Sequence, residues 1–437
     1  MYFLNCGEIY AVSYRGILMI LEINVTKKIE TDVLVVGGGT AGVFAAISAA
    51  KSGAKTTLIE KNSMLGGTMT VASVNFPGLF FAWGNQIISG PCFEAIERVI
   101  ELGGGVMPEI PFYPQEHWKQ QISINRFLFA AVISKMCQET GVKTILNAMV
   151  TAVFEEDEGV VSYITEKSGI TQIKSKKVID ATGDANLVCM AGYPVNKSET
   201  QQPASSMNHI SGFDFNNVSV EEIYEKFSKF DFPDYITADS LISYLRTNRL
   251  SMHIPCKDAD TSEGKTKLEF DTLALALKII RFYKSIKGLE NIVVDFLPEE
   301  TGVRETNRIV GEREITAEEY IKGYFYKDSV CYAFYPIDLH VLDGIKMTYH
   351  DECIVGKIPY RALIPKNSKH ILVAGRCISS DTLANSAIRV EAVCMATGQV
   401  AGCAAAVSSK NGCYVKNVPY SILSDTLKSI GAVLPNN

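Results

Sequence analysis

Residues 31–61, TDVLVVGGGTAGVFAAISAAKSGAKTTLIEK, decide the fold class. The run DVLVV is built from β-branched and aliphatic residues, which is typical of a parallel strand buried on both faces. It ends in GGGTAG, which fits G-x-G-x-x-G, and small apolar residues at helical spacing follow as far as Gly53. A second strand, KTTLIE, ends in Glu60. Strand, glycine-rich turn, helix and strand in this order predict a Rossmann-like dinucleotide-binding unit.

Each glycine of this motif has a physical role. Gly37 permits the tight turn, Gly39 lets a pyrophosphate approach the backbone, and Gly42 lets the helix pack on the strand. The N–H groups at the start of the helix then receive the phosphate charge. Glu60 lies at the end of the second strand and is placed to accept hydrogen bonds from a ribose. Both NAD and FAD satisfy this pattern, so the rest of the chain must distinguish them.

Two more buried strands end in glycine-bearing turns. Residues 142–184 predict a β-meander of short strands that finishes in VIDATGDA, and residues 370–376, HILVAGR, precede a helix rich in small residues. Residues 65–68, LGGT, would let the backbone run close to a flat ligand. A nicotinamide domain would instead continue with further helix–strand units. Three glycine-bearing turns, each at the end of a separate strand, therefore favour one long ligand that is contacted at several points.

Several motifs together resemble a known family. VVGGGTAG, IEKNSMLGG, VIDATGDA, TGVRETNRIVGE, YPIDLH, IPYRALIPK, ILVAGRCISS and SAIRVEAVCMATGQVAG occur in the order seen in FAD-dependent oxidoreductases. That family includes the flavin-binding part of heterodisulfide reductase and is more distantly similar to fumarate-reductase and glutathione-reductase type flavoproteins. The resemblance covers about residues 30 to 430. It implies an FAD-binding fold of the two-dinucleotide type.

The resemblance also implies where the cofactor lies. Arg389 would lie beside the flavin, and a helix starting around Ala387 would point its N-terminus at the pyrimidine edge, where negative charge develops on reduction. The implied cofactor contacts are Gly37, Gly39, Thr40, Ala41 and Gly42 at the pyrophosphate, Glu60 and Lys61 at the ribose, Gly67 and Thr68 along the cofactor, Val150 at adenine, Ala181, Thr182 and Gly183 at the pyrophosphate, and Gly375 and Arg376 at the ribityl chain.

The chain departs from parts of that family. It has no ferredoxin-type cysteine cluster, no closely spaced dithiol, and no histidine between residues 67 and 74. We therefore expect non-covalent FAD, no iron–sulfur cluster and no metal site. Its eleven scattered cysteines favour reduced, buried thiols.

The composition indicates a folded α/β protein that acts on small molecules. The chain has 437 residues and a net charge of -6 without a Lys/Arg run, so it gives no sign of nucleic-acid binding. The apolar stretch from residue 390 to 407 contains Glu391 and favours a buried helix over a membrane span. The N-terminus lacks the features of a signal peptide, and we expect a cytoplasmic protein. Met19 offers an alternative start, which would make residues 1–18 an extension.

We expect a discontinuous FAD-binding domain, residues 30–200 and 355–410, interrupted by an α+β substrate or cap domain at 201–354. Residues 1–29 form an N-terminal extension and residues 411–437 a C-terminal packing segment. The interrupting segment differs in texture, with helical patterns such as VEEIYEKFSKF and the aromatic-rich YIKGYFYKDSVCYAFYPIDLH.

Arg304 and Arg308 are candidates for holding a substrate. They are four residues apart and would share one face of a helix, where two guanidiniums could bind a carboxylate. The alternative is a structural ion-pair cluster that also includes Glu305 and Glu312. The family resemblance favours Arg304 at the site.

Asp338 and His340 are candidates for proton transfer. In YPIDLH they are two residues apart, so they share one face of a strand, and an aspartate can orient a histidine as a general base. A purely structural histidine is the alternative. Tyr360 and Arg361 are further catalytic candidates. The remaining histidines lack a comparable partner and are expected to be structural: His117, His209, His253, His350 and His370.

These observations predict an FAD-dependent oxidoreductase that passes hydride or electrons between a small organic substrate and the flavin. Two alternatives stay open: the flavin-carrying component of an electron-transfer complex with a redox partner protein, or a protein that uses FAD structurally.

Overall fold

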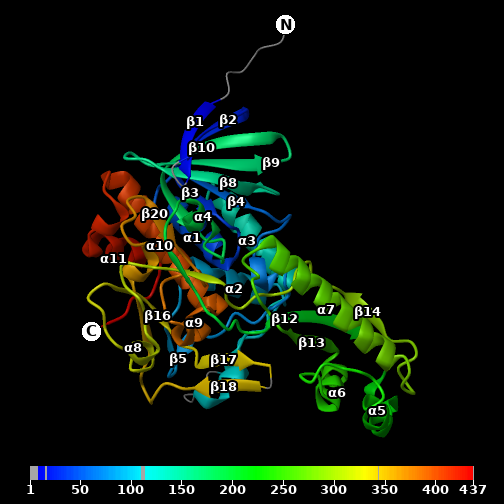
Figure 1. The fold of residues 1–437 in the computed structure, drawn as a ribbon. Helices are drawn as coiled ribbons and strands as arrows, with labels where there is room; N and C mark the ends of the chain where they lie inside the picture. The colour runs from blue at the N-terminus through cyan, green and yellow to red at the C-terminus, as the bar shows by residue number, and fades with distance from the viewer. Residues whose placement is uncertain (1–7, 15–16, 110–113, 343, 437) are drawn as a thin grey trace.

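The computed structural model describes residues 8–14, 17–109, 114–342 and 344–436 (Figure 1). Its centre is a seven-stranded sheet with the order β7-β4-β3-β10-β9-β8, and β20 pairs with the end of β10. The strands are β3 (Val25–Val36), β4 (Thr56–Glu60), β7 (Lys143–Leu146), β8 (Met149–Glu155), β9 (Val160–Glu166), β10 (Gly169–Asp180) and β20 (Ile371–Val373).

The strand β10 joins the parallel and antiparallel parts of this sheet. Its first residues pair antiparallel with β9, and its last three, from Val178 to Asp180, pair parallel with β20. Along most of its length β10 also runs parallel to β3. The carboxyl ends of β3, β10 and β20 therefore meet at one edge of the sheet, and that edge carries all three glycine-bearing turns.

The helices α1 (Thr40–Lys51) and α10 (Glu391–Asn411) pack against each other and against this sheet. Every residue of α10 from Ala392 to Ser409 is buried. The helix α10 is long and apolar enough to cross a membrane, but its apolar stretch lies inside the protein, as expected for a core helix. The remaining helices of the sheet lobe are α2 (Pro91–Glu101), α3 (Arg126–Glu139), α4 (Asn186–Met190), α8 (Ala317–Ile321), α9 (Thr382–Ile388) and α11 (Tyr420–Ser429).

A second lobe projects from the sheet lobe and appears at the lower right of Figure 1. It has its own hydrophobic core, whose members run from Ala204 to Val303, whereas Ile309 and most buried apolar residues after it belong to the first core. The domain boundaries at 200 and 355 stay a prediction. The lobe consists of β12 (Ala204–Ser211), β13 (Arg249–Ile254), β14 (Val293–Phe296), α5 (Val220–Phe227), α6 (Ala238–Thr247) and α7 (Ser262–Tyr283).

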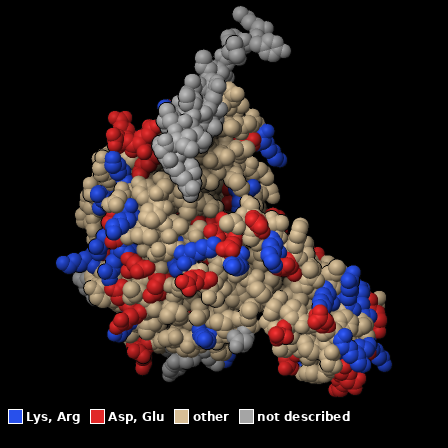
Figure 2. All heavy atoms as spheres, in the orientation of Figure 1, with Lys and Arg blue, Asp and Glu red and all other residues tan. Residues whose placement is uncertain are grey.

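Short strand pairs connect the two lobes and extend the sheet lobe. One of them, the hairpin β17–β18, carries the predicted proton-transfer residues. The pairs are β1 (Glu8–Tyr14) with β2 (Ile17–Ile23), β5 (Phe81–Ala82) with β6 (Asn85–Gln86), β11 (Val195–Lys197) with β15 (Asn307–Ile309), β16 (Ser329–Ala333) with β19 (Gly356–Pro359), and β17 (Ile337–Val341) with β18 (Gly344–Thr348). Figure 2 shows positive and negative side chains intermixed over the visible face of both lobes.

Candidate functional site

The GGGTAG turn forms a backbone cradle at the end of β3. Gly37 has φ +102°, and a Cβ there would collide with the Ala181 carbonyl, so only glycine fits. A Cβ on Gly42 would collide with the Gly37 carbonyl. A Cβ on Gly39, in contrast, would meet only the Gly67 Cα at 3.9 Å. The chain itself therefore leaves space at Gly39, where the motif predicts that a pyrophosphate approaches.

A second loop lies beside this cradle. Gly66 donates a backbone hydrogen bond of 2.8 Å to the Gly38 carbonyl and forms an isolated bridge with Gly39. Gly67 and Thr68 belong to the short 3₁₀ turn that follows. The structure thus brings the predicted contacts at Gly37, Gly39, Thr40, Ala41, Gly42, Gly67 and Thr68 into one region.

Glu60 lies at the end of β4, buried beneath the cradle. Its carboxylate accepts hydrogen bonds from the N–H groups of Gly38, at 2.5 Å, and Asn62, at 2.8 Å. Burial raises the pKa of Glu60 in spite of these bonds and the nearby charge of Lys61. Lys61 turns outward and pairs with Glu300 at 3.1 Å, so it links the cradle to the end of the second lobe.

The turn after β10 completes the cradle from the other side. Asp180 is buried and accepts hydrogen bonds from the Thr182 N–H at 2.9 Å and the Thr182 hydroxyl at 2.7 Å. These bonds order the segment that contains Ala181 and Gly183. Val150, the predicted adenine contact, lies in β8, two residues after Ala148, whose N–H donates to the Glu60 carbonyl at 3.0 Å.

Arg376 follows Gly375 in the turn after β20 and joins the glycine-bearing turns to the second lobe. Its guanidinium donates to the carbonyls of Gly183 and Val303, each at 2.6 Å, and forms an ion pair with Asp184. Burial would lower the pKa of Arg376, but the charge of Asp184 and the hydrogen bond from Arg376 to the Asp184 carboxylate raise it.

The helix expected to start around Ala387 starts later. Ala387 is fully buried inside the short helix α9, which ends at Ile388, and Val390 has extended backbone before α10 begins at Glu391. The N-terminus predicted to face the flavin is therefore that of α10. Arg389 lies in the break between the two helices.

Asp338 and His340 form the predicted pair. His340 Nε2 lies 3.1 Å from Asp338 Oδ2, and both side chains are nearly buried. A carboxylate only accepts hydrogen bonds, so Nε2 carries the proton and Nδ1 has the free lone pair. His340 Nδ1 and Asp338 Oδ1 have no hydrogen-bond partner among the described residues.

The charges around this pair fix its protonation. Burial and the nearby Arg304 lower the pKa of His340, outweighing the opposing effect of Asp338, so the imidazole is neutral at pH 7. Burial would raise the pKa of Asp338, but the hydrogen bond from His340 and the charges of Arg389 and Arg304 lower it. A neutral imidazole beside an ionised carboxylate is the arrangement that a general base requires.

Arg304 acts on this pair electrostatically and reaches it through His253. Its guanidinium donates to the Pro203 carbonyl and, at 3.3 Å, to His253 Nε2. Burial and the neighbouring Arg389 lower the pKa of Arg304 to about 9, which leaves it charged at neutral pH. The His253 ring packs edge-on against His340 with a centroid distance of 5.1 Å.

His253 is the main addition that sequence reasoning missed. It was expected to be structural, but β13 places it between Arg304 and His340. Burial and the charge of Arg304 lower its pKa to about 4, so it stays neutral. No local signal marks it, because its partners lie more than fifty residues away in the chain.

Arg389 and Gln202 complete the cluster. Arg389 reaches Gln202 Oε1 and the Asp338 carbonyl only at 3.5 Å, and its Nε has no partner among the described residues. Gln202 Oε1 also accepts a hydrogen bond of 3.1 Å from the His340 N–H. The Gln202 Nε2 atom likewise lacks a partner among the described residues. Buried polar atoms of folded proteins are nearly always hydrogen-bonded, so these atoms are completed by water or by a bound ligand.

Arg308 does not join Arg304. Residues 301–306 are not helical and β15 begins at Asn307, so the spacing that would have put both on one helix face does not apply. Arg308 is buried in contacts with Glu305 at 3.3 Å, Thr382 at 3.1 Å and the Ser380 carbonyl at 3.0 Å. For Arg308 the structural alternative is therefore correct.

Tyr360 and Arg361 lie elsewhere. The buried Tyr360 hydroxyl donates to the Val415 carbonyl at 2.7 Å, and the half-exposed Arg361 pairs with Asp328 at 2.9 Å. Neither contacts the cluster in these interactions. The expectation that His209 lacks a partner comparable with Asp338 is wrong, since His209 Nδ1 lies 2.9 Å from Asp295, although this pair is exposed.

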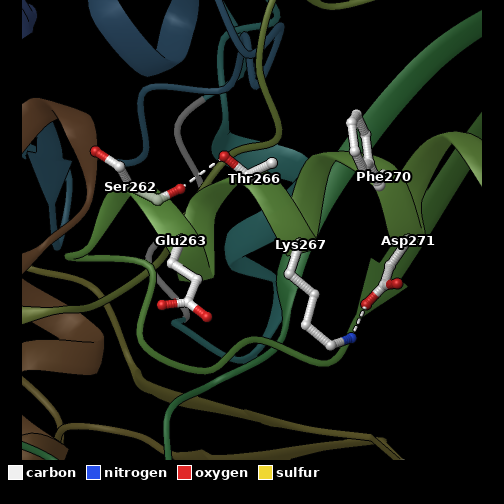
Figure 3. Close-up of a pocket in the computed structure, with 6 residues that line it drawn as sticks. All are labelled: Ser262, Glu263, Thr266, Lys267, Phe270 and Asp271. Atoms are coloured by element: carbon white, nitrogen blue, oxygen red, sulfur yellow. Dashed lines mark hydrogen bonds and ion pairs between the residues drawn. The ribbon is translucent and has the colours of Figure 1, made fainter.

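A surface hollow on the second lobe is separate from this cluster. It lies along α7 and is lined by Ser262, Glu263, Thr266, Lys267, Phe270 and Asp271 (Figure 3). Lys267 is already paired with Asp271 at 2.5 Å. The hollow carries no proton-transfer pair comparable with Asp338 and His340.

The geometry thus defines a dinucleotide-binding flavoprotein fold with a buried polar cluster beside the cofactor cradle. Comparison with known proteins agrees. The family model described as FAD dependent oxidoreductase matches residues 32–427, and the chain belongs to this family. Its cofactor is FAD, and it is an oxidoreductase.

Individual relatives match shorter segments. The thiamine thiazole synthase of Methanococcus vannielii is 30% identical over 170 residues, which are 37% of this chain and 59% of that protein. A heterodisulfide reductase-like protein of Archaeoglobus profundus is 44% identical over 70 residues, or 15% of this chain and 9% of the relative. The chain thus spans at most 59% of the length of these two relatives.

Among solved structures, a geranylgeranyl bacteriochlorophyll reductase-like protein from Thermoplasma acidophilum has a TM-score of 0.45 at 15% identity. That alignment covers 92% of this chain and 83% of the other.

Proposed function

We propose that the chain oxidises or reduces a small organic substrate carrying a carboxylate, bound beside the FAD at the cluster of Arg304, Arg389, Asp338 and His340. Two largely buried guanidiniums, Arg304 and Arg389, face the carboxylate of Asp338, and the other nearby carboxylate, Glu305, is already paired with Arg308. With the histidines neutral, this leaves a positive excess at the cluster. A buried uncompensated charge is costly, and an anionic substrate would compensate it. This excess supports an anion rather than a neutral or cationic substrate.

The residues of the cluster have distinct roles in this proposal. Bound FAD supplies the two-electron acceptor or donor, and the chain positions the substrate against it. Arg304 and Arg389 hold the substrate carboxylate. His340 Nδ1 takes a proton from the substrate, or returns one, and Asp338 keeps the opposite nitrogen protonated and stabilises the imidazolium. The observation that carries the proposal is the free His340 Nδ1 beside the two buried guanidiniums.

Anaerobic spectroscopy tests this proposal. The purified yellow protein is mixed with a panel of 2-hydroxy and saturated carboxylic acids, and loss of flavin absorbance is recorded. In parallel, the protein with reduced flavin is mixed with 2-oxo and 2-enoic acids, and the return of the flavin absorbance is recorded. We expect at least one acid to change the flavin spectrum while its methyl ester, matched in every other respect, does not.

Each other outcome argues against the proposal. An ester that reacts as fast as its acid would exclude recognition of the carboxylate. A flavin that responds to no acid but is reduced by an added protein donor would support the alternative role in electron transfer. A flavin that nothing reduces would support a structural role.

We also propose that residues 201–354 bind and cover the substrate, with His253 contributed by the second lobe and His340 by the part of this segment that packs in the sheet lobe. The ten described cysteines are free and α10 is buried, which supports a cytoplasmic location.

A further inference from the structure

Glu391 connects the last helix of the FAD-binding fold to the first. It is the first residue of α10, and its carboxylate accepts a hydrogen bond from the hydroxyl of Thr40, the first residue of α1. Thr40 belongs to the GGGTAG turn, so this contact places a carboxylate at the helix end that receives the FAD pyrophosphate.

The packing of α1 on α10 explains why Glu391 reaches this place. A Cβ on Gly398 would collide with the Ala41 carbonyl, so the helices touch backbone to backbone at this level. Glu391 lies seven residues before Gly398, which is about 10 Å of helix. The start of α10 therefore extends beyond the start of α1, over the cradle.

The surroundings of Glu391 favour its charged form only weakly. Three elements contribute the charged and titratable groups that face it: Arg376 after β20, Arg389 after α9, and the Cys394 thiol on α10 itself. Neither arginine forms an ion pair with Glu391 among the described residues, and burial raises the pKa of Cys394, so that thiol is neutral. Burial outweighs the Thr40 hydrogen bond and both arginines, and it raises the pKa of Glu391 to about 7.

We propose that Glu391 is a cofactor-binding residue that holds FAD as the neutral carboxylic acid, so that FAD binding takes up one proton from solvent. The pyrophosphate brings two negative charges to the end of α1, where a carboxylate bonded to Thr40 would repel them. A protonated Glu391 removes the repulsion and becomes a hydrogen-bond donor. The inference depends on FAD binding in the cradle and is independent of the substrate proposed above.

Titration calorimetry of FAD into the flavin-depleted full chain tests this directly. Measured in two buffers with different ionisation enthalpies, binding near pH 7 should take up about half a proton per FAD, because free Glu391 with a pKa of about 7 is already half protonated there, and uptake should approach one proton near pH 8. With a free pKa of about 7, the affinity for FAD should be about tenfold weaker near pH 8 than near pH 6. Glu391→Gln should lose both the proton uptake and this pH dependence.

A matched variant controls for the loss of any acid. Glu94 is a half-exposed carboxylate on α2 paired with Arg98, so Glu94→Gln should keep the wild-type pH dependence. If Glu391→Gln retains that dependence, or if the wild-type chain takes up no proton, the proposal is wrong. Should Glu391→Gln fail to fold, infrared difference spectra of the wild-type chain still decide, because FAD binding must then increase the carbonyl signal of a protonated carboxylic acid. An unchanged signal would overturn the proposal.

Discussion

His340 and Asp338 occupy alternate positions of β17, and the imidazole Nε2 lies 3.1 Å from the carboxylate. Because side chains two apart on a strand share a face, the backbone alone brings the pair together. What the backbone cannot supply is the surrounding charge, which comes from Arg304 and Arg389 in other elements. These neighbours keep Asp338 ionised and His340 neutral.

Replacing His340 by Gln should slow proton transfer without removing the flavin. General-base catalysis by a positioned side chain contributes roughly 10²–10⁴-fold, so the rate of flavin reduction by bound substrate should fall by about that factor. Stopped-flow absorbance measures this rate. The pair of His209 and Asp295 offers a control, because it has the same kind of contact but is exposed to solvent, so His209→Gln should leave the rate unchanged. Equal rates for His340→Gln and wild type would remove His340 from the mechanism.

The pH dependence of the same rate should report the environment of His340. The base works only when neutral, so the rate should fall as the pH drops through a pKa below the usual value of about 6.5. Asp338 raises this pKa and Arg304 lowers it, so Asp338→Asn should move the acid limb to lower pH and Arg304→Gln to higher pH. Shifts in the same direction for both variants would contradict the assignment.

The lowered pKa of His340 also predicts how the stability of the folded chain changes with pH. Since the folded chain binds a proton on His340 less readily than the unfolded chain, His340 costs stability as the pH falls below about 6.5. Thermal unfolding between about pH 7 and pH 5 should therefore show a smaller loss of stability for His340→Gln than for the wild type. An equal loss in both proteins would indicate that His340 is not buried in neutral form.

Replacement of Arg304 by Gln should affect substrate binding, whereas the same replacement of Arg308 should affect folding stability. Losing one partner of a desolvated charge pair costs about 2–5 kcal/mol of binding, so Arg304→Gln should weaken substrate binding by about 30-fold or more while the fold persists. Arg308→Gln leaves Glu305 buried without its partner, which should cost about 3–5 kcal/mol of folding stability. Substrate titration and denaturant unfolding distinguish the two. A large loss of stability from Arg304→Gln together with normal substrate binding would reverse the roles.

The cradle could be predicted from the sequence because its determinants are local. The G-x-G-x-x-G turn, the strand before it and Glu60 after it all lie within thirty residues, and the structure has each of them as expected. The break before α10 has no such signal. Residues 386–390, SAIRV, contain neither Gly nor Pro, and the N–H group of Ala392 at the new helix start is satisfied by the distant Pro77 carbonyl at 2.7 Å.

The polar cluster could be predicted only in part for the same reason. Asp338 and His340 follow from strand periodicity, but their association with Arg304 and His253 requires segments from both lobes to meet. The pairing of Arg304 with Arg308 assumed a helix, and the extended backbone that leads into β15 separates them. Periodicity reports which residues share a face of one element, not which elements meet.

Gly39→Ala should separate cofactor binding from folding. A Cβ at this position meets only the Gly67 Cα, at 3.9 Å, and the backbone φ of -66° suits alanine, so thermal stability without FAD should change by less than about 1 kcal/mol. The methyl group would nevertheless occupy the space predicted for the pyrophosphate, so the purified variant should be colourless and take up FAD at least tenfold more weakly. Gly42→Ala provides the contrast, because its Cβ collides with the Gly37 carbonyl and should destabilise the fold itself. If Gly39→Ala were purified yellow with wild-type affinity for FAD, the pyrophosphate could not lie against Gly39, and the placement of the cofactor along the three glycine-bearing turns would be wrong.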